Sequence, residues 1–164
     1  MKFTLPDKKY LGAFAVGLLW GAILMFIGGT LYLRHSLIVE SECQGSVEQS
    51  IAQIQKNALK MPSWQVQQAS CSIPETSDGA KIYVLRLCNP GYAAEMLELA
   101  SDRKFSAAIP CGISFYKKPD GKVYMAKVNM PLLSRLFGGE PAYVMNKKAV
   151  PEQHFLMNGV LKGK

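Results

Sequence analysis

The sequence lacks the motifs that usually assign a catalytic or cofactor-binding role. Among its 164 residues there are only two histidines, His35 and His154, and they lie far apart along the chain. Its four cysteines form no Cys-x-x-Cys, and there is no Cys-x-x-Cys-His for covalent haem attachment. A P-loop, a dinucleotide fingerprint and a Gly-x-Ser-x-Gly are also missing. We therefore expect neither an enzyme nor a bound cofactor, and thiols without a nearby histidine are a weak site for copper or zinc.

Charged side chains are absent from residues 11–33. As a helix rising about 1.5 Å per residue, this stretch is long enough to cross a hydrocarbon core of roughly 30 Å. A cleaved signal peptide is the alternative, but its apolar core usually runs only about 7–15 residues. Arg34 follows the apolar stretch at once, as at a membrane boundary. The pattern predicts an uncleaved, single-pass transmembrane helix over residues 11–34.

Positive charge is distributed unevenly about this span. Lys2, Lys8 and Lys9 precede it, whereas only Arg34 follows it closely. Because positively charged flanks tend to stay in the cytoplasm, we expect residues 1–10 to be cytoplasmic and the rest of the chain to lie outside. In a Gram-negative cell this predicts an inner-membrane protein with a periplasmic domain, for which nucleic acid is not an expected partner.

Small residues line one side of the predicted membrane helix. Ala13, Gly17 and Gly21 recur at every fourth position and therefore share one helix face. Such spacing lets two helix backbones approach closely, although glycine is common in membrane helices in any case. Besides the lipid bilayer, we expect a larger integral membrane complex or a second copy of the chain as the partner.

Beyond the span the sequence alternates between helical and strand periodicities. It predicts a helix over 43–60, a strand over 63–73, a turn over 74–80, a strand over 81–87, a helix over 90–101, a strand over 105–118, a turn over 119–121 and a strand over 122–130. Asn89 is the expected N-cap of the second helix, with Pro90 at its first position. The last two strands are expected to form a hairpin. Helices packed on an antiparallel sheet make an α+β two-layer sandwich.

These elements divide the chain into successive parts. They are a cytoplasmic N-terminus over 1–10, the transmembrane helix over 11–34, a linker over 35–43, the soluble α+β domain over 44–130 and a C-terminal extension over 131–164. Residues 130–137 are predicted to form a short amphipathic helix that caps the core, with a place on the membrane surface as the alternative. Residues 141–164 have no strong period and are expected to be extended over a partner or disordered.

The four cysteines are expected to pair, because thiols outside the cytoplasm are usually oxidised. A helix over 90–101 rises roughly 18 Å, and the strand from 106 to 111 returns about 17 Å at roughly 3.3 Å per residue. Cys111 thus comes back to the level of Cys88, and the same arithmetic brings Cys71 back to Cys43. We predict the bridges Cys43–Cys71 and Cys88–Cys111, although equal height leaves the lateral separation of each pair open.

Thiol chemistry is the alternative for Cys88 and Cys111. Cys88 precedes a helix start, where the helix dipole lowers the pKa of a thiol and favours the thiolate. That position suits a redox-active pair, but the absence of a Cys-x-x-Cys favours a structural bridge or buried thiols. No other residue is a candidate for catalysis.

Part of the sequence is similar to a known family. Cys-Asn-Pro at residues 88–90 opens a helix, Ile-Pro-Cys at 109–111 lies on the following strand, and Gly121 marks a turn before a final strand. This pattern resembles the domain of unknown function 302 family, over about residues 44–130. The resemblance implies a small α+β domain of TATA-binding-protein-like fold, often dimeric and without an established enzymatic activity.

The chain departs from that pattern in its membrane anchor, in Cys43 and Cys71, and in the tail after Met130. These additions indicate a domain recruited to a membrane assembly. We therefore expect a non-catalytic accessory or scaffold subunit of a larger membrane complex. The alternatives are a membrane-tethered thiol–disulfide or sulfur-handling protein that uses Cys88 and Cys111, and a small-ligand binding module with a pocket between sheet and helices.

Overall fold

The computed structural model describes residues 8–69, 73, 75–109 and 111–163. The chain divides into two units, Met1–Ser36 and Leu37–Lys164, and each is described by itself. The first unit forms one helix, α1 (Lys8–Ser36), which confirms the helix predicted over 11–34. Its stretch Tyr10–Ser36 has a mean hydropathy of 2.2 and is long and apolar enough to cross a membrane; a signal sequence meets the same criteria.

The described strands of the second unit form one antiparallel sheet in the order β1-β5-β4-β3-β2. They are β1 (Ile38–Glu42), β2 (Gln65–Gln68), β3 (Ile82–Cys88), β4 (Cys111–Lys117) and β5 (Val123–Val128). Strands β4 and β5 form the predicted hairpin. Its turn closes with the Gly121 N–H donating to the Lys118 carbonyl, and Gly121 has a φ of 81°, a conformation that favours glycine.

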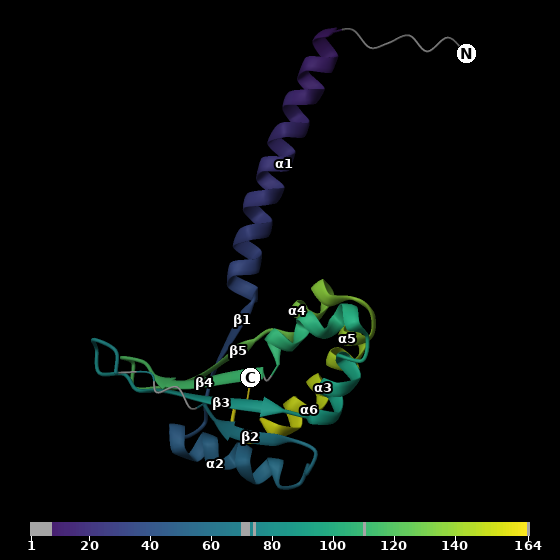
Figure 1. Ribbon diagram of the computed structural model, residues 1–164. Helices are drawn as coiled ribbons and strands as arrows, with labels where there is room; N and C mark the ends of the chain where they lie inside the picture. The colour runs from purple at the N-terminus through teal and green to yellow at the C-terminus, as the bar shows by residue number, and fades with distance from the viewer. Residues whose placement is uncertain (1–7, 70–72, 74, 110, 164) are drawn as a thin grey trace. The chain divides into compact units, whose positions relative to one another are not determined.

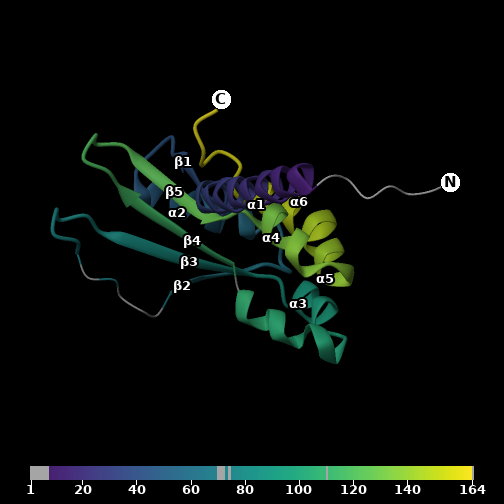
Figure 2. The same ribbon diagram turned by 90° about the horizontal axis from the view of Figure 1, so that it is seen from above.

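Helices cover the sheet on one face and at one end. They are α2 (Val47–Ala58), α3 (Pro90–Met96), α4 (Met130–Phe137), α5 (Gly139–Val144) and α6 (Val150–Leu156), with a 3₁₀ helix η1 (Ala100–Ala108) and a π-helical turn η2 (Met145–Ala149). Figures 1 and 2 show α3, α4, α5 and α6 gathered at the end of the sheet where β3 stops and β4 starts. The α+β class and the antiparallel sheet are therefore confirmed.

The first strand lies in the segment 35–43, which the sequence predicts as a linker. β1 pairs with β5 in a register that runs from Ile38 opposite Val128 to Glu42 opposite Tyr124. The run Ile-Val-Glu-Ser-Glu is short and two of its five residues are acidic, a composition typical of a solvated connection. Its hydrogen-bond partner lies far along the chain, and such pairing leaves no local signal in the sequence.

Helix α2 starts where the sequence offers a capping box. The Ser46 side chain accepts from the Gln49 N–H at 3.2 Å, and the Gln49 side chain accepts from the Ser46 N–H at 2.9 Å. This reciprocal pair satisfies two backbone donors that a helix start leaves free. The helix predicted over 43–60 is confirmed with narrower bounds, and its face carrying Ile54 is fully buried.

The next helix is shorter than predicted. Asn89 caps α3 as expected, accepting from the Gly91 and Tyr92 N–H groups, but the helix ends at Met96 instead of continuing to residue 101. Beyond Met96 the chain turns into η1, and the following strand begins at Cys111 rather than at 105. The reason is tertiary, because Phe105 of η1 stacks on Phe137 with ring centroids 4.3 Å apart.

The C-terminal segment is folded, so the expectation of an extended or disordered stretch over 141–164 is wrong. Helix α4 forms as predicted, and the residues after it pack as short helices that bury Val144, Leu156 and Val160 to 1% exposure or less. No single period runs through them because each short element contributes only one or two core side chains. The core lies between these side chains, α2 and the inner face of the sheet, where Leu85 and Phe115 are also buried.

Candidate functional site

Two cavities lie at opposite ends of the β3–β4 pair. The larger, of about 820 Å³, is lined by residues beside the β4–β5 turn, including Lys117 and Val123, which are paired across that hairpin. The smaller, of about 40 Å³, is lined by Leu87 and Cys111, which are paired at the other end of the sheet. The two are candidate binding sites with different chemistry.

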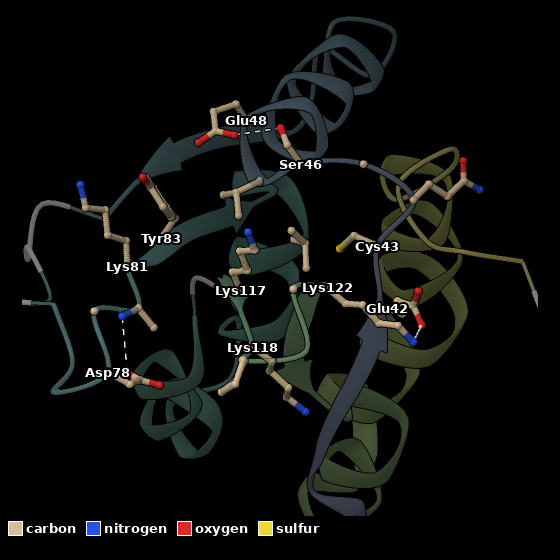
Figure 3. A pocket seen from close by; sticks show the side chains of 18 residues that line it. Glu42, Cys43, Ser46, Glu48, Asp78, Lys81, Tyr83, Lys117, Lys118 and Lys122 are labelled. Atoms are coloured by element: carbon tan, nitrogen blue, oxygen red, sulfur yellow. Dashed lines mark hydrogen bonds and ion pairs between the residues drawn. The ribbon is translucent and has the colours of Figure 1, made fainter.

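The larger cavity, here called the lysine pocket, is open and polar (Figure 3). Its lysines are Lys81, Lys117, Lys118 and Lys122. Several are already paired: Lys122 lies 3.2 Å from Glu42, Lys118 lies 2.5 Å from Glu40, and Lys81 lies 3.1 Å from Glu75. Hydrogen bonds from Lys162 and Lys122 hold the pKa of Glu42 below its usual range. The pocket therefore presents solvated ion pairs rather than a cluster of unneutralised cations.

Cys43 borders the lysine pocket but belongs to the core (Figure 3). It is 6% exposed and carries a free thiol, and burial raises its pKa, with a hydrogen bond from Ser50 opposing the shift. Its predicted partner Cys71 lies outside the described residues. The pairing of Cys43 with Cys71 therefore stays a prediction.

The smaller cavity, here called the sulfur pocket, collects side chains from distant parts of the chain. Its sulfur-bearing lining residues are Cys88, Met96, Cys111, Met130 and Met145. They come from the end of β3, the end of α3, the start of β4, the start of α4 and the start of η2. The turn capped by Asn89 directs the chain away from the sheet immediately after Cys88, which makes room for this convergence.

Cys88 and Cys111 are brought to one cavity, as the sequence predicts, but the structure holds both as free thiols. The register of the sheet places Cys111 opposite Leu87, one residue before Cys88. Adjacent residues of a strand point to opposite faces, so Cys88 is not the direct cross-strand partner of Cys111. The Sγ atom of Cys111 instead lies 4.0 Å from Sδ of Met130.

The thiol of Cys111 lies in an apolar environment with two polar neighbours. Burial raises its pKa, while a hydrogen bond from Gln153 and the charge of Lys127 favour the thiolate. Gln153 is 3% exposed, and burial lowers the pKa of Lys127. Lys127 and Cys111 also line an adjoining hollow of about 230 Å³. The dominant effect at Cys111 is burial, so its neutral thiol is favoured.

A carboxylate joins the two aromatic side chains that close the sulfur pocket. Glu152 accepts from the Trp64 ring N–H at 2.6 Å and from the Tyr92 hydroxyl at 2.7 Å. The two rings meet edge to face with centroids 6.3 Å apart. The bond to Glu152 raises the pKa of Tyr92 to about 12. Both ring positions are thus held by one carboxylate.

Sequence reasoning missed the contribution of the C-terminal segment to this pocket. Met130, Met145 and Gln153 all lie beyond the last predicted strand or at its end, and Met130 and Met145 read as core filler. The one usable signal was Met130, placed directly between a strand and a helix start. Only the packing of α4, η2 and α6 shows which methionines face Cys111.

The glycines of the small-residue face of α1 have no neighbour that would meet an added side chain among the described residues. A Cβ atom placed on Gly17 or Gly21 would meet nothing within 4 Å, and Ala13 is exposed. This leaves the predicted helix-packing role of Ala13, Gly17 and Gly21 as a prediction.

Comparison with known proteins finds one matching family and a similar solved structure. Residues 77–150 match the family described as "Domain of unknown function DUF302". The crystal structure of an uncharacterized conserved protein DUF302 from Bacillus stearothermophilus is similar, with a TM-score of 0.59 and 15% sequence identity, covering 75% of this chain and 97% of the other. No curated protein matches.

Residues 131–150, expected to be an addition to the family's pattern, lie inside the matched range. Residues 77–150 are thus similar to the DUF302 family, and the fold is similar to that of a solved DUF302 protein.

Proposed function

We propose that this chain is a membrane-tethered, non-catalytic binding domain whose ligand site is the sulfur pocket. The observation that carries the proposal is the convergence of two free thiols and three thioethers on one small, largely apolar cavity. Met96, Met130 and Met145 are each 6% exposed or less, so these sulfurs face the interior and not solvent. A fold that needs only apolar filler at this place has no requirement for both thiols.

The size and the protonation of the pocket favour binding over catalysis. A cavity of about 40 Å³ is far below the roughly 300–1,000 Å³ of sites that enclose organic substrates. Burial raises the pKa of Cys111, and a protonated thiol is a poor nucleophile. The small volume favours a small ligand, and the raised pKa of Cys111 disfavours a role in thiol–disulfide exchange.

The tether is α1, with residues 1–10 in the cytoplasm and the domain on the outer face of the inner membrane. The length and hydropathy of Tyr10–Ser36 support this arrangement, as does the excess of lysine before the span. Cys111 is half-buried, and the sheet pairs it with Leu87 and not with Cys88, which disfavours a bridge between the two cysteines.

A second role, as an accessory subunit of a larger membrane complex or as a homodimer, is favoured by the open face of Ala13, Gly17 and Gly21. Extraction from native membranes in mild detergent followed by native electrophoresis tests it. Co-migration with a larger assembly that is lost in Gly17→Leu supports this role, whereas a chain that migrates alone contradicts it.

Thiol mapping tests the binding function directly. The full chain is extracted from native membranes, unfolded without reductant in the presence of an alkylating reagent, and digested for mass spectrometry. We expect alkyl groups on both Cys88 and Cys111. Recovery of their peptides as a disulfide-linked pair would contradict the proposal and favour a structural or redox-active bridge.

A further inference from the structure

We infer that the sulfur pocket binds one soft monovalent metal ion, of the class of Cu(I), through the sulfurs of Cys111, Met130 and Cys88. The inference rests on the proposed function and names its ligand. It goes against the expectation from sequence that the chain binds no metal, because the sequence showed the thiols and not the thioethers that join them.

The cavity has the size of a single ion. A site needs about 10–15 Å³ to hold one water molecule, so about 40 Å³ is enough for one ion and too small to enclose a typical organic ligand. The pocket is lined almost entirely by apolar atoms, with Gln153 and Asn89 among the few amides. An ion entering it must exchange its water for sulfur, which only a soft, weakly hydrated cation does readily.

The donor set selects the metal class. Thiolate and thioether ligands favour Cu(I) over hard cations, which require carboxylate, carbonyl or water oxygen. The described lining residues of the pocket include no histidine and no carboxylate. Zinc prefers four thiolate, imidazole or carboxylate ligands, so two thiols with thioethers suit it poorly. The pocket therefore distinguishes Cu(I) from the commoner divalent ions.

The distance between the sulfur atoms of Cys111 and Met130 agrees with coordination of one metal ion by both. Two ligands at about 2.3 Å from a metal, with an angle of about 120° between them, are about 4.0 Å apart. Sγ of Cys111 and Sδ of Met130 are separated by 4.0 Å. Coordination of one trigonal ion by these two atoms therefore requires no change in their separation, and Cys88 lines the same cavity as the proposed third ligand.

Charge also balances. Binding displaces the protons of Cys88 and Cys111 to solvent, so two thiolates and one monovalent ion leave a single negative charge. Lys127 and Cys111 line the same adjoining hollow, so the lysine is placed to offset that charge. Met96 and Met145, each 4% exposed or less, complete a sulfur-rich wall that keeps water away.

Anaerobic competition for Cu(I) tests the inference. The full chain in detergent, with its thiols reduced, is titrated into Cu(I) held by a chromophoric chelator. We expect one equivalent per chain. Cys111→Ser should weaken binding by about 100-fold, and Met130→Leu, which removes the sulfur but conserves volume, by about tenfold.

Matched variants make the result specific. Met125→Leu removes a thioether that is 1% exposed in the core but does not line the pocket, and Cys43→Ser removes a buried thiol elsewhere. Both should bind as the wild type does, and circular dichroism verifies that every variant is folded. Failure of the wild type to take up Cu(I), or equal affinity in Met130→Leu and Met125→Leu, overturns the inference. If Cys88 and Cys111 are found as free thiols in that case, the proposed function stands with another ligand; if they are bridged, both fail.

Discussion

The sulfur pocket and the lysine pocket occupy the two ends of the same pair of strands, yet they are built in opposite ways. The lysine pocket is about twenty times larger in volume, at about 820 Å³ against about 40 Å³, and its charged groups lie at strand ends, on loops and at the start of α2. The sulfur pocket is walled by side chains of the core. The lysine pocket is thus formed by charged residues at the surface, whereas the sulfur pocket is formed by side chains that pack in the core.

This difference explains why size alone is a poor guide to the site. Exposed ion pairs such as Lys122–Glu42 are screened by water and salt, and they neutralise one another without leaving a charge for a ligand. In the sulfur pocket, by contrast, the three thioethers are buried and the two thiols are half-buried, so water competes less with a ligand for these donors. The four predictions that follow test this contrast, from the largest expected effect to the smallest.

Removing the wall of the sulfur pocket should have the largest effect. Met145 is 2% exposed, and Met145→Ala should lower the free energy of unfolding by about 2–5 kcal/mol through lost burial and a new cavity. Denaturant unfolding of the full chain in detergent measures it. Lys117→Ala, in the lysine pocket, is the control and should leave the unfolding midpoint unchanged. Equal effects of the two variants would contradict the contrast.

Removing the helix cap beside either pocket should lower the free energy of unfolding by a similar amount. The two substitutions should differ in how they change the alkylation rate of Cys88. Asn89→Ala and Ser46→Ala each remove a cap and should lower the free energy of unfolding by about 0.5–2 kcal/mol. Only Asn89→Ala loosens the turn after Cys88, so it alone should accelerate alkylation of Cys88 in the folded protein. Equal alkylation rates in the two variants would show that this turn does not shape the sulfur pocket.

Two tyrosine hydroxyls should have raised pKa values for different reasons. The pKa of Tyr92 is raised to about 12 mainly by its bond to Glu152, and that of Tyr116 to about 12 mainly by burial, with Glu40 second. Because both folded-state values exceed the ordinary value of 10.0, their stabilising contribution is complete below pH 10 and is lost as the pH rises toward 12.

Isotope-labelled tyrosine followed by NMR measures these titrations. Glu152→Gln should lower the pKa of Tyr92 more than Glu40→Gln lowers that of Tyr116. The order of the two shifts is the result that matters, since a larger shift at Tyr116 would mean that its carboxylate neighbour, and not burial, is the main cause.

The smallest effect is expected at the exposed ion pairs of the lysine pocket. Lys118 hydrogen-bonds Glu40 at 2.5 Å, but both side chains are more than a third exposed. Lys118→Ala should leave the thermal midpoint nearly unchanged at high salt and shift it only slightly at low salt, because salt screens the pair. A salt-independent loss of stability would show that this pocket is part of the folded core after all.

Local signals predicted local structure well. Asn89 followed by Pro90 located the start of α3, the helical periodicity within 43–60 predicted α2, and the turn at Gly121 joined the hairpin. Each of these depends on hydrogen bonds or backbone angles within a few residues. The errors were of the opposite kind: β1 in the supposed linker and the folded C-terminal segment both depend on partners far along the chain.

The sequence predicted only part of the candidate site, because it contains local signals but not the partners of distant segments. Cys88 and Cys111 were assigned to one place because a helix and a returning strand of matched length connect them. Whether the two sulfurs bond to each other depended on lateral register, and the sheet places Cys111 opposite Leu87. No arithmetic along the chain supplies that register, because it is set by the pairing of β3 and β4.

By itself, then, the sequence determined an apolar helix of membrane-spanning length, the order of the central helices and strands, and the proximity of Cys88 and Cys111. These follow from charge, periodicity and capping, all of which act between near neighbours. Only the tertiary structure decided that Met130 lies 4.0 Å from Cys111 and that Met145 and Gln153 close the same cavity. Short helices with one or two buried residues each carry no period of their own, so their place is set by the core they complete.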